Sequence, residues 1–124
     1  MANKTILIID DDPPTLHALR DKFKSKGFNV LTANDGVSGL GAAMKNHPDI
    51  ILLDIIMPRM DGLTMLKKLR EDEWGKTAEV IMLTNLSDND KIEEAAQAGT
   101  YDYLIKTNWG IEDVVKKVKE KLKM

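Results

Sequence analysis

Cysteine is absent from this 124-residue sequence, and its absence excludes disulfides, thiolate metal sites and thiol catalysis. Long hydrophobic runs are absent as well. The N-terminal apolar stretch is too short for a signal sequence and far too short to span a bilayer. A large charge of one sign is also lacking: the net charge is −2, which draws the chain neither to nucleic acid nor to an anionic membrane. We therefore expect a cytoplasmic protein that contacts neither nucleic acid nor membrane directly.

The composition is that of an ordinary globular domain. Hydrophobic residues make up 43% of the chain and charged residues 31%, which is typical of folded rather than disordered sequences. A chain of 124 residues is near the common domain size and long enough to bury a core. No internal repeat, low-complexity tract or linker divides it, so we predict one domain over residues 1–124. The two histidines, His17 and His47, belong to no motif and are interpreted as surface residues.

Strand and helix patterns alternate five times along the sequence. Apolar runs predict five strands, over residues 5–9, 28–33, 50–53, 80–83 and 101–105. The second run carries Asn29 and Thr32, which is typical of an edge strand. Apolar residues at helical spacing follow each run: Leu16, Leu19 and Phe23; Val37, Leu40 and Met44; Leu63, Leu66 and Leu69; Ile92, Ala95 and Ala96; Ile111, Val114, Val115, Val118 and Leu122. Such alternation implies parallel βαβ units with right-handed crossovers, so we predict an α/β, doubly wound (βα)5 fold with a five-stranded parallel sheet.

Some element boundaries are also visible in the sequence. Asp12 is predicted to cap the first helix, which begins with Pro13-Pro14, and Gly27 to end it. Residues 34–36, Asn-Asp-Gly, predict a turn into the second helix. The polar stretch 71–77 is predicted to be a surface loop.

The most informative stretch is residues 50–62. Ile50–Leu53 are four bulky apolar residues, typical of a strand buried on both faces of a parallel sheet, and Asp54 follows at once. Pro58 has no amide hydrogen, so the strand cannot continue past it, and Asp61-Gly62 provides turn chemistry before the next helix. A carboxylate at the end of an interior strand stands where α/β sheets place ligand sites, and its charge needs compensation.

Polar residues also follow other predicted strands. The strand ends carry Asp10 and Asp11 on the first, Asp54 on the third, Thr84 on the fourth and Lys106 on the fifth. In a parallel sheet these ends lie along one edge, so the side chains should converge from distant positions in the sequence. Three neighbouring acids repel one another and resist ionising together without a cation. Oxygen ligands without histidine or cysteine suit Mg²⁺, a hard ion that keeps several waters.

The remaining groups at this edge extend the chemistry. A lysine there neutralises a further anion or pairs with an acid. Aspartate, Mg²⁺, lysine and a small hydroxyl are the components expected for handling a phosphoryl group. The metal ion and the lysine offset charge on the phosphoryl oxygens while a carboxylate attacks in line.

The sequence resembles a response-regulator receiver domain of two-component signalling, of the single-domain chemotaxis type, over essentially its whole length. Four motifs carry the resemblance: Ile-Leu-Ile-Ile-Asp10-Asp11-Asp12, Leu-Leu-Asp54-Ile-Ile-Met-Pro58-Arg-Met-Asp61-Gly62, Ile-Met-Leu-Thr84 and Gly99-Thr-Tyr-Asp-Tyr103-Leu-Ile-Lys106. Each motif alone is weak, but the four at these spacings form a highly specific signal. The resemblance implies a flavodoxin-like strand order, 2-1-3-4-5.

The resemblance also implies roles for the strand-end residues. Asp54 would be the phospho-acceptor, receiving the group from a phosphohistidine of a sensor kinase or histidine phosphotransfer protein. Asp11 and Asp54 would bind Mg²⁺ directly, with Mn²⁺ a possible substitute. Asp10 would act mainly through water, and the backbone carbonyl of Ile56 would complete the protein ligands. By this resemblance the protein would not be an enzyme, beyond phosphorylating itself and slowly losing the group.

A switch is implied as well. Thr84 and Lys106 would contact the phosphoryl oxygens, and Tyr103 would swing inward as Thr84 moves. That motion would remodel the surface of the fourth helix, fifth strand and fifth helix, which a downstream protein partner reads. Half-buried packing explains Tyr103 equally well. A monomer or weak homodimer is expected, because the fourth and fifth helices could form a dimer face.

Three alternatives remain open. An inactive receiver that works only as a docking module would share the fold. An aspartyl-phosphate phosphatase of the haloacid dehalogenase type also uses a strand-end aspartate and Mg²⁺, but it needs an acid where this chain has Ile56. A dinucleotide-binding module is the third, since Gly36, Gly39 and Gly41 are closely spaced. Their order differs from the dinucleotide fingerprint, and we interpret them as a turn and close helix packing.

Two positions depart from the family pattern. Thr107 stands where proline, often in a cis peptide, follows the lysine. A non-proline cis bond costs about 2.5–4 kcal/mol, so we predict a trans linkage, which bears on the reach of Lys106 and on the loop into the last helix. Asn85 replaces a small residue and could restrict access to the site or offer an amide to the phosphoryl group. Ile56 and Leu86 would line the approach of the hydrolytic water, and both are apolar, so we predict a long-lived phosphoryl group.

Overall fold

The computed structural model describes residues 3–84, 103–105 and 110–124. Its elements are β1 (Thr5–Ile9), α1 (Pro13–Ser25), β2 (Asn29–Ala33), α2 (Gly36–Asn46), β3 (Ile50–Asp54), α3 (Gly62–Arg70), the 3-10 turn η1 (Gly75–Thr77), β4 (Val80–Thr84), β5 (Tyr103–Ile105) and α5 (Ile111–Lys121). The predicted fourth helix and residues 101–102 lie outside the described residues. None of the described helices is long and apolar enough to cross a membrane.

The five strands form one parallel sheet in the order β2-β1-β3-β4-β5. This confirms the predicted five-stranded parallel sheet and its order, and it places β2 at an edge as its polar residues indicated. The order reverses at β1 and β3, which are neighbours although α1, β2 and α2 separate them in the chain. After β1 the chain crosses to β2 on one side, whereas after β3 it crosses to β4 on the other side. Such switch points in strand order are where α/β sheets bind ligands.

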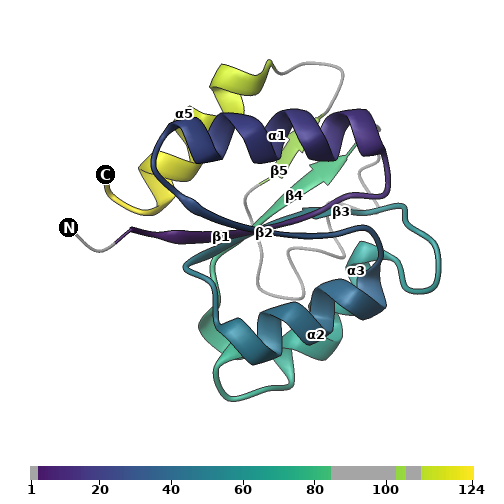
Figure 1. Cartoon of the computed structure of the whole chain (residues 1–124). Coiled ribbons are helices and arrows are strands. Elements are labelled where there is room, and N and C mark those ends of the chain that lie inside the picture. The colour runs from purple at the N-terminus through teal and green to yellow at the C-terminus, as the bar shows by residue number, and fades with distance from the viewer. Residues whose placement is uncertain (1–2, 85–102, 106–109) are drawn as a thin grey trace.

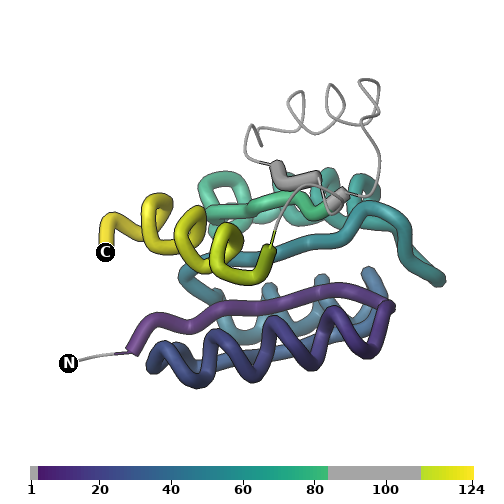
Figure 2. Tube along the Cα trace, turned by 90° about the horizontal axis from the view of Figure 1, so that it is seen from above, coloured from purple at the N-terminus to yellow at the C-terminus, as the bar shows by residue number. Residues whose placement is uncertain are grey.

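Helices cover both faces of the sheet, with α1 and α5 on one side and α2 and α3 on the other (Figure 1). Side chains of β1 alternate accordingly: Leu7 and Ile9 pack towards α2 and α3, whereas Ile6 and Ile8 pack towards α1 and α5. Seen from above in Figure 2, α1 and α5 lie side by side over the sheet. All five residues of β3 are buried, as expected for a central strand covered on both faces.

Aspartates cap three of the described helices that begin at the carboxyl edge of the sheet. Asp12 accepts a hydrogen bond from the Thr15 N–H at the start of α1, which confirms the predicted cap. Asp35 caps α2, where the sequence indicated only a turn. Asp61 caps α3, and Gly62, also interpreted as part of a turn, is the first residue of that helix. The other boundary is confirmed at Gly27, which follows α1 with φ +89°.

The first residue of α3 lies directly against the end of β3. The Gly62 N–H donates to the Ile55 carbonyl at 2.7 Å. A Cβ atom at Gly62 would lie 2.1 Å from the carbonyl oxygen of Asp54, far inside van der Waals contact. Only glycine permits this approach. The contact fixes where α3 begins relative to the end of β3.

We expect Gly62→Ala to lower the free energy of unfolding by about 1–3 kcal/mol, because backbone atoms of β3 would have to move to admit the methyl group. Gly41→Ala is the matched control: a Cβ there meets nothing within 4 Å, so the change should stabilise α2 by about 0.5–1 kcal/mol. Urea unfolding of both variants measures the difference. Equal stabilities would contradict the close packing of α3 on β3.

Candidate functional site

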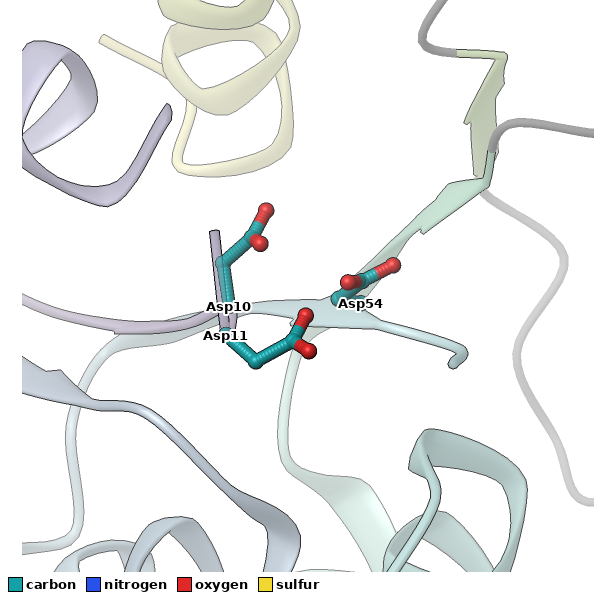
Figure 3. A group of neighbouring side chains, drawn as sticks. All are labelled: Asp10, Asp11 and Asp54. Atoms are coloured by element: carbon teal, nitrogen blue, oxygen red, sulfur yellow. The ribbon is translucent and has the colours of Figure 1, made fainter. Parts of the chain in front are cut away.

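Three aspartates gather where β1 and β3 end. Asp10 and Asp11 directly follow β1, and Asp54 is the last residue of β3. One carboxylate oxygen from each lies within 4.8 Å of the others, and Figure 3 shows the three side chains together at this edge. Asp10 is fully buried, Asp54 is 4% exposed and Asp11 is exposed, so the cluster opens to solvent on the side of Asp11. The predicted convergence of these acids is confirmed by the structure.

The donor set of this cluster fits a hard divalent ion. All three side chains offer carboxylate oxygens, the ligand type that Mg²⁺ prefers. Opposite ligands of an octahedral Mg²⁺ lie about 4.2 Å apart, so oxygens at this spacing can share one ion with small side-chain rotations. The burial of Asp10 and Asp54 strengthens the mutual repulsion that such an ion would relieve.

Asp10 is held in place by its own turn. Its backbone N–H donates to the Ala33 carbonyl at 3.1 Å, which extends the pairing of β1 with β2 by one residue. Its Oδ1 accepts from the Asp12 N–H at 2.9 Å. These contacts leave the neighbouring Asp11 side chain on the exposed side of the turn. Two adjacent acids therefore have different surroundings, one buried beneath the edge and one facing solvent.

The remaining predicted site residues belong to β4 and β5 or follow them. Thr84 is the last residue of β4 and is in register with Ile105, the last residue of β5, so both strands end at the edge that carries Asp54. Tyr103 begins β5, in register with Met82. Lys106 is next in the sequence after β5 and lies outside the described residues, as do Asn85, Leu86 and Thr107.

Ile56 lies in the loop that joins β3 to α3, between Ile55 and Met57. On one side, the Ile55 N–H donates to the Leu83 carbonyl at 3.3 Å and its carbonyl accepts from Gly62. On the other side, Met57 is buried in the core shared with α2 and α3. The Ile56 side chain itself is 61% exposed, which is unusual for a large apolar residue. It stands two residues after Asp54, in the loop that follows the acidic end of β3.

Asp35 is a further buried acid near this loop, and the sequence indicated no role for it beyond a turn. The Ser38 N–H donates to it at 2.7 Å and holds the pKa of the Asp35 carboxyl below its ordinary value, against the opposing effect of burial. Arg59 in the β3–α3 loop also lowers this pKa by its charge. A cap of this kind can be inferred from an aspartate just before a helical pattern, but the arginine partner cannot.

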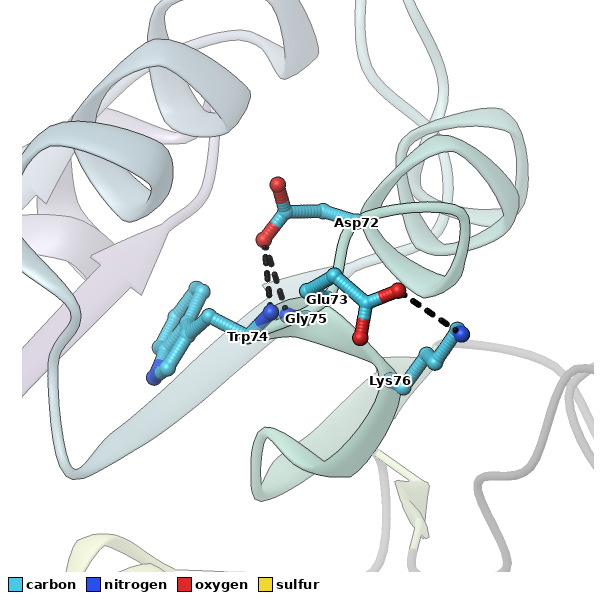
Figure 4. Close-up of polar contacts among 5 residues, drawn as sticks. All are labelled: Asp72, Glu73, Trp74, Gly75 and Lys76. Carbon is cyan, nitrogen blue, oxygen red and sulfur yellow. Dashed lines mark hydrogen bonds and ion pairs between the residues drawn. The ribbon is translucent and has the colours of Figure 1, made fainter.

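A second ordered feature lies at the opposite, amino edge of the sheet. The predicted surface loop contains η1, and Asp72 accepts hydrogen bonds from the Trp74 and Gly75 N–H groups, each at 3.0 Å (Figure 4). His47 is exposed as predicted, but it stacks on Trp74 with ring centroids 4.4 Å apart. These residues precede β3 and β4, so they stabilise the loops at the edge away from the acidic cluster.

A match to a protein-family model over nearly the whole chain identifies the family. The model of the response regulator receiver domain matches residues 6–119, which includes both strand ends that form the acidic cluster. The chain belongs to this family. Receiver domains are signalling modules of two-component systems rather than enzymes of metabolism, and they interact with histidine kinases or phosphotransfer proteins.

Curated relatives of this receiver domain are longer proteins. The transcriptional regulator RpaA of Synechocystis is 37% identical over 119 residues, covering 95% of this chain and 48% of that protein. The response regulator PleD of Caulobacter vibrioides is 36% identical over 110 residues, covering 89% of this chain and 24% of PleD. The chain therefore spans half or less of the length of these relatives.

Solved receiver structures match the fold along its length. A CheY-like receiver domain protein from Methanospirillum hungatei superposes with a TM-score of 0.91 at 28% identity, covering 98% of this chain and 95% of that one. The receiver domain of the sensor histidine kinase PA1611 from Pseudomonas aeruginosa has a TM-score of 0.86 at 27% identity, covering 96% and 97%. That structure contains a magnesium ion coordinated in its active-site cleft.

Repulsion within the acidic cluster can be measured without any phosphodonor. Asp11→Asn removes one of three crowded charges, so in the presence of chelator we expect it to raise the free energy of unfolding by about 1 kcal/mol. Added Mg²⁺ should then stabilise the wild type more than the variant. Asp21→Asn, at an exposed acid of α1, is the control and should show neither effect. Urea unfolding with and without Mg²⁺ measures all three proteins, and a destabilised Asp11→Asn would contradict the repulsion.

Proposed function

We propose that Asp54 accepts a phosphoryl group from a phosphohistidine of a sensor kinase or histidine phosphotransfer protein, with Mg²⁺ required. The observation that carries the proposal is the position of this carboxylate. It ends the central strand, is 4% exposed, and lies within 4.8 Å of the carboxylates of Asp10 and Asp11. Membership of the receiver family supports a phosphoryl-accepting role for this site.

Four residues would hold the metal ion. Asp11 and Asp54 supply carboxylate oxygens directly, Asp10 acts mainly through a water molecule, and Ile56 supplies its backbone carbonyl. When bound, Mg²⁺ offsets negative charge on the acceptor and on the phosphoryl oxygens, and Mn²⁺ suits the same oxygen donors. The exposure of Asp11 leaves the cluster accessible from solvent, as an ion that retains waters requires.

The transfer is a single in-line displacement at phosphorus. An oxygen of the Asp54 carboxylate forms the new P–O bond as the P–N bond to the donor imidazole breaks, and the electron pair of that bond stays with the imidazole. The product is an acyl phosphate on Asp54 and a free histidine on the donor. Thr84 and Lys106 would contact the phosphoryl oxygens, the threonine by its hydroxyl and the lysine by its charge.

The phosphorylated domain would act by changing its surface. Thr84 would move towards the phosphoryl group and Tyr103 would turn inward with it, which alters the face built from the predicted fourth helix, β5 and α5. Thr84 ends β4, and Tyr103 begins the neighbouring strand β5, in register with Met82. A shift of Thr84 could therefore be passed to Tyr103 through the paired strands. We propose that a protein partner reads this face and that the domain is a monomer or a weak homodimer.

Phosphorylation by acetyl phosphate tests the acceptor directly. We expect one hydroxylamine-labile phosphoryl group per chain with Mg²⁺, none with chelator, and none in Asp54→Asn. Asp61→Asn, in the same loop, is the control: asparagine still caps α3, so labelling should persist. Intact-protein mass measures the label. An unlabelled wild type would indicate a docking module, and continuous phosphate release would indicate a phosphatase.

The lifetime of the phosphoryl group depends on what can orient the attacking water. The exposed Ile56 side chain offers that water no hydrogen bond, and Leu86 would be a second apolar group on the same approach. We expect Ile56→Asn combined with Leu86→Glu to hasten the decay of phosphorylated protein several-fold after the donor is removed. Ile56→Leu is the apolar control and should decay like the wild type. If the polar double variant decays no faster, the apolar side chains at positions 56 and 86 do not set the lifetime.

A further inference from the structure

A strained backbone position stands in the loop between Asp54 and α3. Arg59 has φ +66°, in the left-handed region that non-glycine residues seldom adopt. Across it, the Met60 N–H donates to the Pro58 carbonyl at 2.7 Å. Together these features form a γ-turn with positive φ at its centre, a rare and strained conformation. Such strain persists only where the surrounding structure holds it, and it clusters at functional sites.

Two contacts with α2 hold this turn. The Nη2 atom of Arg59 lies 3.3 Å from Oδ2 of Asp35, the N-cap residue of α2. The Met60 carbonyl packs so closely on Gly36 that a Cβ there would lie 2.1 Å from its oxygen. The first contact is electrostatic and the second steric. Both dock the turn onto the first residues of α2.

The two side chains of this ion pair differ in exposure, and the difference shows which partner is fixed. The Asp35 side chain is 2% exposed, whereas that of Arg59 is 70% exposed. Exposed pairs contribute little because both side chains must be ordered. In this pair the carboxylate is already held by its hydrogen bond to the Ser38 N–H. The contact therefore orders the arginine and the loop that carries it.

We propose that Arg59 is a positioning residue for the metal ion: through Asp35 it holds the β3–α3 loop so that the Ile56 carbonyl can bind the ion. The inference rests on the proposed function, because it takes Ile56 as a metal ligand. Only Met57 separates Ile56 from Pro58, the first residue of the turn, and proline is stiff at φ. A turn released from α2 would therefore displace the peptide that carries the ligand.

Charge alone predicts the opposite effect of removing Arg59. Its guanidinium is a cation on the same loop as the proposed Ile56 ligand, so its loss by itself should tighten the binding of Mg²⁺. Loss of a contact that orients a metal ligand weakens binding, typically by about tenfold or more. The direction of the change therefore separates a positioning role from a general electrostatic one.

The test is calorimetric titration of Mg²⁺ into ion-free wild-type protein, Arg59→Asn, Arg59→Lys, Asp35→Asn and the Asp35→Asn, Arg59→Asn double variant. Asparagine tolerates the left-handed region and caps helices well, so these substitutions remove charge while keeping the turn and the cap. Arg20→Gln is the control, because it removes a cation from an exposed pair with Asp21 on α1. Thermal unfolding in chelator shows whether each variant is folded.

We expect Arg59→Asn and Asp35→Asn to weaken Mg²⁺ binding about tenfold, and the double variant no more than either alone. Arg59→Lys should retain most of the affinity, and Arg20→Gln all of it. Wild-type or tighter affinity in Arg59→Asn overturns the positioning role and leaves the proposed function intact. So does an equal loss in Arg59→Lys, which keeps the charge. A wild type that binds no Mg²⁺ overturns both.

Discussion

The crowding of three carboxylates at the end of two apolar strands is the constraint on which the rest of this structure depends. Strands covered on both faces can accommodate charged side chains only at their ends. The acids of this sheet therefore lie where its strands end. At the carboxyl edge they divide into two groups. Asp12, Asp35 and Asp61 cap helices, and each carboxylate accepts a hydrogen bond from a backbone N–H group of the first turn. Asp10, Asp11 and Asp54 each have a carboxylate oxygen within 4.8 Å of the others, and the divalent cation proposed above would relieve their repulsion.

The loop after β3 connects these two groups of acids. It begins at the proposed acceptor, passes the exposed Ile56, turns at Arg59 and ends at the cap of α3. Glycines at positions 36 and 62 let it pack against α2 and β3 without space for a side chain. A capping acid and the proposed metal site are thereby joined by a short, closely packed segment. Packing, rather than loop sequence alone, determines where the backbone carbonyls of this segment lie.

The sequence predicted what depends on local pattern. Unbroken apolar runs such as Ile50–Leu53 identified the buried strands, and parallel strands require that their ends share an edge, so the meeting of Asp10, Asp11 and Asp54 followed. Contacts that depend on tertiary packing left no such signal. The ion pair of Asp35 with Arg59 and the stacking of His47 on Trp74 join residues from separate elements. Such contacts leave no periodic pattern in the sequence. The roles predicted for Thr84, Tyr103 and Lys106 stay predictions, because they depend on side chains beyond the described part of the structure.

The most direct test of the central claim is anomalous diffraction from crystals grown with Mn²⁺, which replaces Mg²⁺ among oxygen ligands. The account predicts one strong peak between β1 and β3, within direct coordination distance of carboxylate oxygens of Asp11 and Asp54 and of the Ile56 carbonyl. A peak bound elsewhere, or no peak beside these carboxylates at saturating Mn²⁺, would contradict it.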